Sequence, residues 1–265
     1  MKSPNRYDKI IEHIFLGNFR KGSLEVFFDR SEIETVAAEL GIKLPKNLGD
    51  LIYSFRYRNA LPDAILSKAP AGTQWIIRPA GRARYCFAAV TVSRILPTEN
   101  LAETKLPDAT PGVISMYALT DEQALLAKLR YNRLIDIFTG VTCYSLQNHL
   151  RTTVPGLGQI ETDEIYIGLD RRGAHYVFPV QAKGGNDQLS IVQIEQDFGM
   201  ARAKFASLVC RPIAAQFLSD DLIALFEFEE SAAGVKLLAE KHYRLVPPDQ
   251  ISSAEIDVYR NRTDS

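Results

Sequence analysis

The sequence predicts a mixed α/β (α+β) protein built from two domains. The second half contains several runs rich in Val, Ile, Tyr and Phe that alternate with helical patterns, which is typical of a mixed sheet with helices. The first half combines amphipathic helices with a short hairpin. Between them, residues 96–119 carry Pro97, Pro107, Pro111 and Gly112, which interrupt regular structure. We therefore expect domains at 1–95 and 120–265, joined by a linker at 96–119.

Bulk composition is that of a water-soluble globular protein. Hydrophobic residues make up 46% and charged residues 24% of the 265-residue chain. No apolar run approaches the roughly 18–20 residues of a membrane span, and the N-terminus is too polar for a signal peptide. The three cysteines lack Cys-x-x-Cys spacing, which argues against zinc and a disulfide framework. We expect a cytoplasmic protein with no membrane partner.

Charge is unevenly distributed although the net charge is only −1. Residues 1–95 carry 15 Lys and Arg against 9 Asp and Glu, and the remainder carries 16 against 23. A basic half beside an acidic half is typical of a polyanion-binding module joined to a cation-binding module. Ordinary scatter of charges is the alternative.

The first half has a definite order of elements. Periodic apolar residues predict a helix over Tyr7–Phe15, and Leu24–Phe28 has the composition of a strand. Ser31 and Glu34 form a capping box that opens a helix through Leu40, which Gly41 ends. A further helix is predicted over Leu48–Tyr57, followed by a hairpin of Gln74–Arg78 and Arg84–Val90.

This order resembles a winged helix-turn-helix, a class whose second helix of the turn unit enters the DNA major groove and whose hairpin contacts the backbone. The resemblance implies double-stranded DNA as a partner. The contacting residues would be Lys46, Asn47, Arg56 and Arg58 at the helix, with Arg78, Arg82 and Arg84 on the hairpin. A solvated arginine face is the alternative for these residues, and some winged helices bind proteins instead. Phe55 is expected in the core.

The second half is predicted to begin with a helix over Leu125–Phe138 and a short helix over Tyr144–Leu150. Two strands, Glu161–Leu169 and His175–Lys183, flank a turn containing Gly173. A helix is predicted over Ser190–Phe205. Three strands follow, at Val209–Phe217, Leu222–Phe228 and Val235–Val246, and a closing helix is predicted at 254–260.

Polar side chains converge at the ends of the two hairpin strands. Because side chains alternate along a strand, Asp163 shares a face with Ile165, and Gln181 shares a face with Lys183. A carboxylate and an amide oxygen are hard ligands suited to Mg²⁺, and a neighbouring lysine can position a water and balance phosphate charge. Most such hairpins are inert solvated edges, but polar groups directly after an apolar run require a reason.

At these residues the chain resembles the PD-(D/E)xK nuclease superfamily, over roughly residues 120–246. Asp163 matches the first acid, and Gln181-Ala182-Lys183 matches the second element. The resemblance implies an α-β-β-β-α-β core and phosphodiester hydrolysis with Mg²⁺, for which Mn²⁺ can substitute. Asp163 and Gln181 would be the metal ligands. Gln181 departs from the family's usual carboxylate, and either Glu161 or Glu164 would restore that charge.

The family often places an acid on a helix before the first catalytic strand, but no acid occurs between Asp136 and Glu161. His149, in this interval, is a candidate metal or phosphate contact, with a surface or capping role as the alternative.

These inferences lead to one leading hypothesis and two alternatives. The hypothesis is a sequence-specific type II restriction endonuclease that cuts duplex DNA, as a homodimer if both strands of a symmetric site are cut. One alternative is a structure-specific DNA-repair nuclease, which would recognise branched DNA. The other is a non-catalytic DNA-binding regulator in which Gln181 marks a decayed site.

Overall fold

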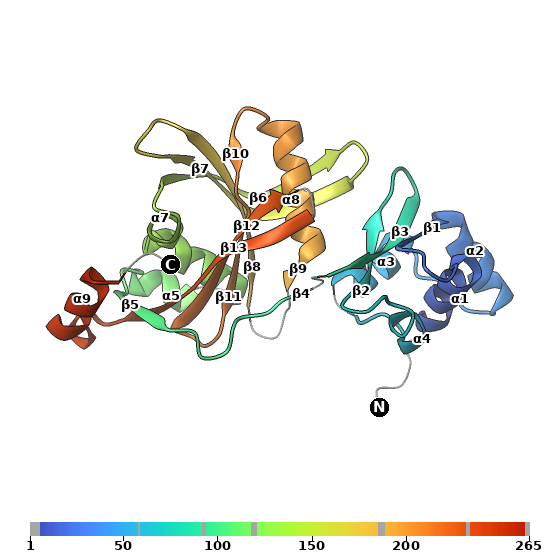
Figure 1. Ribbon diagram of the computed structural model, residues 1–265, viewed down its shortest axis with the longest axis horizontal. Helices are drawn as coiled ribbons and strands as arrows, with labels where there is room; N and C mark the ends of the chain where they lie inside the picture. Colours follow the sequence, from blue (N-terminus) through green and yellow to red (C-terminus); the bar gives the residue numbers. More distant parts are fainter. Residues whose placement is uncertain are drawn as a thin grey trace. The chain divides into compact units, whose positions relative to one another are not determined.

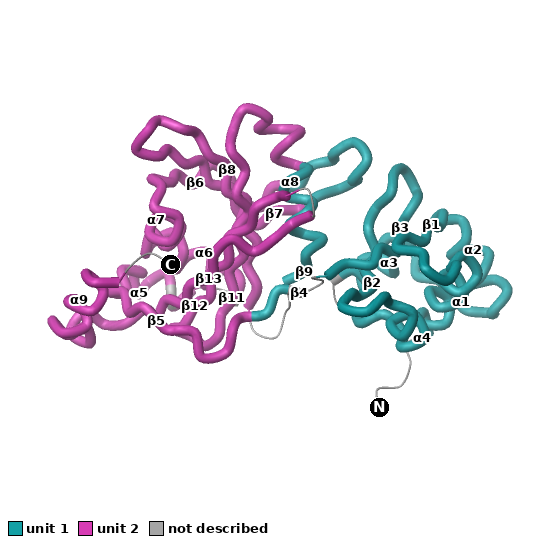
Figure 2. The backbone as a smooth tube through the Cα atoms, in the orientation of Figure 1, with its two compact units in different colours: residues 1–96, 151–160, 188–199 teal, residues 97–150, 161–187, 200–265 magenta. Residues whose placement is uncertain are grey.

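The computed structural model describes residues 6–57, 59–91, 94–117, 121–184, 189–231 and 234–262. It confirms a mixed α/β protein with a large mixed sheet and helices (Figure 1). The chain divides into two compact units, which Figure 2 distinguishes by colour. Unit 1 comprises residues 1–96, 151–160 and 188–199, and unit 2 comprises residues 97–150, 161–187 and 200–265. No helix among the described residues is long and apolar enough to cross a membrane.

Unit 1 contains four helices among residues 8–66 and a three-stranded antiparallel sheet of order β1-β3-β2. The helices cover the sheet with an apolar core in which Phe15 makes edge contacts with Trp75 and Phe87, each at 5.1 Å between ring centroids. Phe55 is buried in this core, as expected. The elements are α1 (Asp8–Asn18), β1 (Glu25–Asp29), α2 (Arg30–Glu39), α3 (Leu48–Tyr57), α4 (Asp63–Leu66), β2 (Gln74–Pro79) and β3 (Arg84–Val90).

The N-terminus of α2 differs from the prediction by two residues. Asp29, at the end of β1, is the N-cap, and its backbone N–H donates to the Glu32 carboxylate at 2.7 Å. The capping box is therefore Asp29 with Glu32, while Ser31 lies inside the first turn. Asp29 takes the position because its backbone is still extended where the strand ends, as an N-cap requires.

Unit 2 is built on an eight-stranded mixed sheet of order β5-β13-β12-β11-β8-β7-β6, with β10 paired to β8. The β8–β11, β8–β10 and β5–β13 pairs are parallel, whereas β7–β8, β11–β12 and β12–β13 are antiparallel. The strands are β5 (Glu103–Pro107), β6 (Thr142–Val154), β7 (Gly158–Leu169), β8 (His175–Lys183), β10 (Val209–Cys210), β11 (Ile213–Phe217), β12 (Leu222–Ser231) and β13 (Gly234–Val246).

The helices of unit 2 are α5 (Gly112–Tyr117), α6 (Asp121–Tyr131), α7 (Leu134–Thr139) and α9 (Ser253–Arg260), and α8 (Ile191–Lys204) begins in unit 1 and ends in unit 2. A 3₁₀ turn (Pro248–Gln250) precedes α9, and the short strands β4 (Arg94–Ile95) and β9 (Leu189–Ser190) pair with each other. The apolar residues of α6 and α7, including Leu125 and Leu129, share a core with Phe178, Val180 and Ala182. The two helices therefore cover the sheet face that carries the even-numbered residues of β8.

The β7–β8 hairpin forms as its sequence predicts. Asp170 closes the turn because its Oδ1 accepts from the backbone N–H groups of Arg172 and Ala174, at 2.8 and 2.9 Å. Gly173 supplies the left-handed backbone that the turn needs, with φ +83°. The pairing runs from Leu169 opposite His175 to Glu164 opposite Val180. This register places Asp163 and Gln181 just beyond the last recorded pair.

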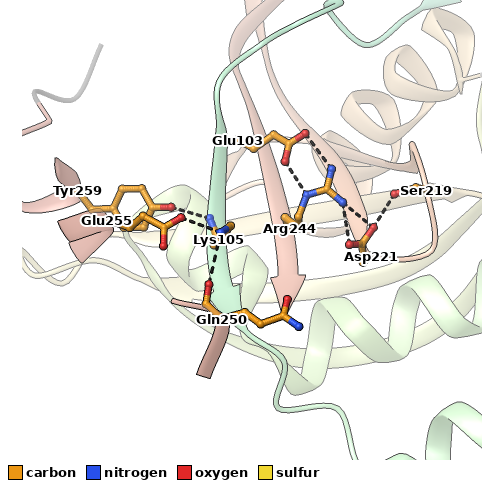
Figure 3. A network of polar contacts seen from close by, with 8 residues as sticks. All are labelled: Glu103, Lys105, Ser219, Asp221, Arg244, Gln250, Glu255 and Tyr259. Atoms are coloured by element: carbon orange, nitrogen blue, oxygen red, sulfur yellow. Dashed lines mark hydrogen bonds and ion pairs between the residues drawn. The ribbon is translucent and has the colours of Figure 1, made fainter. Parts of the chain in front are cut away.

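A network of ion pairs fastens the β5 edge of the sheet (Figure 3). Arg244 of β13 bonds Glu103 of β5 through Nε and Nη2, at 2.6 and 2.9 Å, and also bonds Asp221. Lys105 links β5 to α9, with its Nζ 2.8 Å from a Glu255 carboxylate oxygen and its backbone N–H donating to the Tyr259 hydroxyl. These contacts tie β5 and α9 to the sheet.

Residues 96–119, expected to be a linker, contain regular structure. Residues 103–107 form β5, which pairs with β13 and so belongs to the sheet. Residues 112–117 form the helix α5. Pro107 is the last residue of β5 and does not break the pairing, because an edge strand tolerates a missing N–H group.

Two helix predictions in the second half also need correction. The predicted helix at 125–138 is two helices, because Arg133 adopts a left-handed backbone with φ +50° between α6 and α7. Buried Asn132 stabilises that break, since its side chain bonds the Ala109 N–H, at 2.7 Å, and Thr110. The predicted helix at 144–150 is instead part of β6, where pairing with β7 outweighs the local pattern.

Candidate functional site

Asp163, Gln181 and Lys183 come together in unit 2, where the recorded pairing of β7 with β8 stops. Asp163 is 6% exposed, and its Oδ2 accepts from the Ala182 backbone N–H at 2.8 Å. Lys183 Nζ lies 3.8 Å from the same oxygen. The Asp163 carboxylate therefore accepts the bond that a strand partner would otherwise accept from Ala182. This contact fixes Oδ2, so Oδ1 is the oxygen through which Asp163 would bind a ligand.

Gln181 is held beside Asp163 with a defined amide orientation. The side chain is buried, and its Nε2 donates to the Glu161 backbone carbonyl at 3.1 Å. Because the amide nitrogen is used in this way, Oε1 is the atom through which Gln181 would bind a cation. A neutral oxygen donor at this position is compatible with Mg²⁺, which accepts carboxylate, amide and water oxygens.

Glu122 joins this group electrostatically, and sequence reasoning missed it. It lies in the first turn of α6 and is half-buried. Burial raises the pKa of Glu122, repulsion by Asp163 raises it further, and Lys183 opposes both effects. The sequence search covered only the interval from Asp136 to Glu161. Glu122 could have been identified as an acid in the first turn of a predicted helix whose apolar side packs on β8.

The charge on Asp163 is influenced by the same neighbours. Its pKa is raised above the ordinary value because the side chain is buried, and the nearby Lys183 ammonium lowers it. Two acids whose pKa values are raised by burial and by negative neighbours, such as Glu161, are typical of a site where a cation provides the missing compensation.

Glu161 and His149 form a pair next to this group. His149 Nε2 of β6 lies 3.0 Å from a Glu161 carboxylate oxygen of β7, and both side chains are partly exposed. His149 favours ionisation of Asp163 and of Glu122, whereas Glu161 opposes it. The structure therefore brings Glu161 close to the site, but its carboxylate is engaged with the imidazole.

Glu164 is not brought together with Asp163. Adjacent strand residues face opposite sides of a sheet, and the Glu164 carboxylate is fully buried on the α6 side. Its Oε1 accepts from Arg130 Nε at 3.1 Å, from Arg130 Nη2 at 3.0 Å and from Ser145 Oγ at 2.5 Å. A cavity of about 260 Å³ adjoins this pair and is lined in part by Arg130, Ser145 and Tyr166. Glu164 thus cannot replace the carboxylate missing at Gln181.

The donor set suits a hydrated hard cation. Asp163, Gln181 and Glu122 offer only oxygen atoms, which Mg²⁺ prefers, and Mg²⁺ commonly keeps several waters and uses one or two carboxylates. Among the described residues, no three His, Cys, Asp or Glu side chains are grouped to hold a metal ion. A metal here would therefore depend on the amide oxygen and on water as well as on the two acids.

Three of the predicted DNA-contacting residues lie on the surface of unit 1. Lys46 is exposed just before α3, and Arg82 is exposed in the β2–β3 turn. Arg84 is exposed at the start of β3, where its guanidinium lies 4.9 Å from the centre of the Phe27 ring and 3.9 Å from Asp29. These side chains are available to a polyanion.

The other predicted DNA-contacting residues bond to other side chains or are partly buried. Asn47 caps α3, accepting from the Gly49 N–H at 3.0 Å and donating to Asp50 at 2.9 Å. Arg56 is only partly exposed, with Nε and Nη2 buried. Arg78 makes a two-point ion pair with Glu195, in which its Nε lies 2.7 Å from Oε2. Arg58 lies outside the described residues.

Comparisons of the chain with protein-family models, with curated proteins and with solved structures find no match. The residues and their geometry are therefore the basis for a functional proposal.

Proposed function

We propose that the chain is a Mg²⁺-dependent endonuclease that hydrolyses duplex DNA, of the type II restriction kind. The observation that carries the proposal is the grouping of Asp163, Gln181 and Lys183 with Glu122 at the point where β7 and β8 cease to pair. Burial and repulsion raise the pKa of both acids. Such a group is suited to a divalent cation and a phosphate.

The order of elements supports the same proposal. Along the chain, α6, β6, β7, β8, α8 and β11 occur in this order, with α7 and the short strands β9 and β10 between them, and β11 pairs parallel to β8. This is the α-β-β-β-α-β order that a PD-(D/E)xK core requires. Glu122 on α6 also supplies the helix acid that this family often has, although the sequence interval first searched contains none.

The chemistry assigned to each residue follows from its atoms. Asp163 Oδ1, Gln181 Oε1 and the Glu122 carboxylate would hold the cation. Bound Mg²⁺ would polarise the scissile phosphate and favour loss of a proton from the attacking water. Lys183, already 3.8 Å from Asp163, would orient that water or balance the charge that develops on the phosphate. The attacking water would form a new P–O bond as the P–O bond to the sugar breaks, and the leaving sugar oxygen would take a proton from solvent to become a hydroxyl.

Unit 1 supports the DNA-binding part of the proposal. Its helices and β1-β3-β2 sheet follow the order of a winged helix, and Lys46, Arg82 and Arg84 are exposed. Lys and Arg side chains bind phosphates without regard to sequence, which holds a duplex but does not select a site.

The test is incubation of the purified protein with a long linear duplex of mixed sequence and Mg²⁺. A sequence-specific endonuclease produces discrete fragments, and chelation with EDTA prevents them. A branched duplex of matched composition is the control, because preferential cutting at the branch would favour a structure-specific repair nuclease instead. An intact linear duplex at high enzyme and Mg²⁺ or Mn²⁺ concentration would contradict the proposal.

A further inference from the structure

The backbone of His149 has an unusual conformation. Among the described residues, four non-glycine residues have positive φ: Ala83, Asn100, Arg133 and His149. The first three lie in turns, whereas His149, at φ +54°, lies within strand β6. A left-handed residue is costly for an L-amino acid with a bulky side chain, and such outliers concentrate at functional sites.

The conformation places the imidazole against the candidate site. His149 Nε2 is 3.0 Å from Glu161, whose backbone carbonyl accepts the Gln181 amide at 3.1 Å. One short chain of contacts therefore runs from His149 through Glu161 to a proposed metal ligand. The nearby His149 ring also lowers the pKa of Asp163 and of Glu122, in opposition to burial, which raises both.

One side of the ring remains for a ligand. The side chain of His149 is 55% exposed, and among the described residues Nδ1 has no hydrogen-bond partner. Glu161 fixes the orientation of the ring from Nε2, as a carboxylate commonly does for a functional histidine. A His149–Glu161 pair with a purely structural role could have the same distance. It would not need a left-handed backbone at His149 that exposes the ring to solvent beside two acids.

We infer that His149 is a substrate-contacting residue, which donates from Nδ1 to a phosphate oxygen of the DNA strand being cut while Glu161 orients the ring. This inference rests on the proposed nuclease function and adds a role to it. Glu161 is then a positioning residue and not the substitute metal ligand. An N–H donor beside Asp163 and Glu122 would favour binding of a phosphate that these two acids would otherwise repel.

The test uses the full chain and the variants His149→Asn, His149→Gly and Glu161→Gln. Asn and Gly accept a left-handed backbone at little cost, so both variants should fold with melting temperatures equal to or above that of the wild type. We expect the single-turnover cleavage rate to fall at least about tenfold, because a hydrogen bond to a charged group is lost. Affinity for Mn²⁺ without DNA, measured by calorimetry, should stay unchanged.

Rescue by added imidazole distinguishes a substrate contact from a structural role, because free imidazole would not rescue a structural defect. Added imidazole should restore part of the cleavage rate of His149→Gly, because the free ring can occupy the space that the variant leaves. It should not restore Asp163→Ala, which serves as the control.

The outcomes separate the two proposals. A His149→Asn variant that cuts as fast as the wild type overturns the inference and leaves the nuclease proposal standing. Loss of Mn²⁺ binding in that variant also overturns it, because His149 would then be a metal ligand. A wild-type protein that cuts no duplex under any of these conditions overturns both.

Discussion

Adjacent residues of β7 have different roles at the residue scale. Asp163 lies beside Lys183 on one face of the strand, and Glu164 forms a buried ion pair with Arg130 on the other. A buried carboxylate requires a partner or a function, because leaving water is expensive for a charge. Arg130 and Ser145 meet that requirement for Glu164, whereas for Asp163 a lysine and one backbone N–H are the recorded partners. This difference is the reason for proposing Asp163, and not Glu164, as the functional acid.

Gln181→Glu is predicted to tighten metal binding and to lower the stability of the metal-free protein. The new carboxylate would add negative charge next to Asp163 and so tighten Mn²⁺ binding, which calorimetry measures. It would also lose the hydrogen bond that Nε2 donates to the Glu161 carbonyl. We expect the metal-free variant to lose about 1–3 kcal/mol of unfolding free energy, in denaturant titrations, because a buried acceptor is left without its donor.

Weaker Mn²⁺ binding by Gln181→Glu would show that the residue is not a ligand. Unchanged stability would show that the amide contact contributes nothing.

Gly168→Ala is predicted to destabilise unit 2 by overpacking. A Cβ at this position would lie 2.6 Å from a Phe178 ring carbon and 2.7 Å from a Val141 methyl. Such insertions typically cost about 1–3 kcal/mol of unfolding free energy, which chemical denaturation measures. Gly17→Ala is the matched control, because its Cβ meets no atom within 4 Å and Ala favours the helix α1. Equal effects of the two changes would contradict the packing described for Gly168.

At the scale of elements, local sequence signals predicted some parts of the fold better than others. The β7–β8 hairpin and α3 are confirmed, because turn residues such as Gly173 act within their own segment. The strand at 144–150 was predicted as a helix, since its identity depends on pairing with β7. Glu122 was missed for the same reason, because its approach to Asp163 depends on how α6 packs on β8. Long-range packing decides both.

Attachment of α9 to β5 is predicted to weaken in acid. The Lys105 ammonium, followed by the Ser252 N–H, lowers the pKa of Glu255 from 4.5 to about 2. Because the folded pKa lies below the unfolded value, this stabilisation is complete above pH 4.5 and is lost as the pH falls toward 2. Hydrogen-exchange protection of α9 amides should fall across that range.

Glu255→Gln should remove this pH dependence, because the amide does not titrate. The exposed acid Asp257, changed to Asn, is the control and should leave it in place. Protection of α9 that is constant between pH 5 and pH 3 in the unchanged protein would contradict the role given to the Lys105–Glu255 pair.

At the scale of the whole molecule, we propose that residues 1–95, which have a basic excess, bind DNA and that the acidic site of unit 2 cuts it. If Arg82 contacts a phosphate, Arg82→Ala should reduce the slope of log K for duplex DNA against log salt by roughly 0.9. Fluorescence anisotropy over a range of salt concentrations measures that slope. Arg78→Ala is the control and should leave the slope unchanged, since Arg78 is ion-paired with Glu195. Equal reductions would mean that the Glu195 pair opens when DNA binds.

The most direct test of the central claim is the Mg²⁺-dependent cleavage rate of Asp163→Ala, measured alongside its affinity for the same duplex. We predict that cleavage is abolished while DNA binding is nearly intact, because we propose that the exposed cations of unit 1 carry most of the binding. Lys183→Ala should also stop cleavage but retain Mn²⁺ binding, and Asp257→Ala, which removes an exposed acid of α9, should cut normally. Full activity in Asp163→Ala would contradict the proposed site, whatever the other variants did.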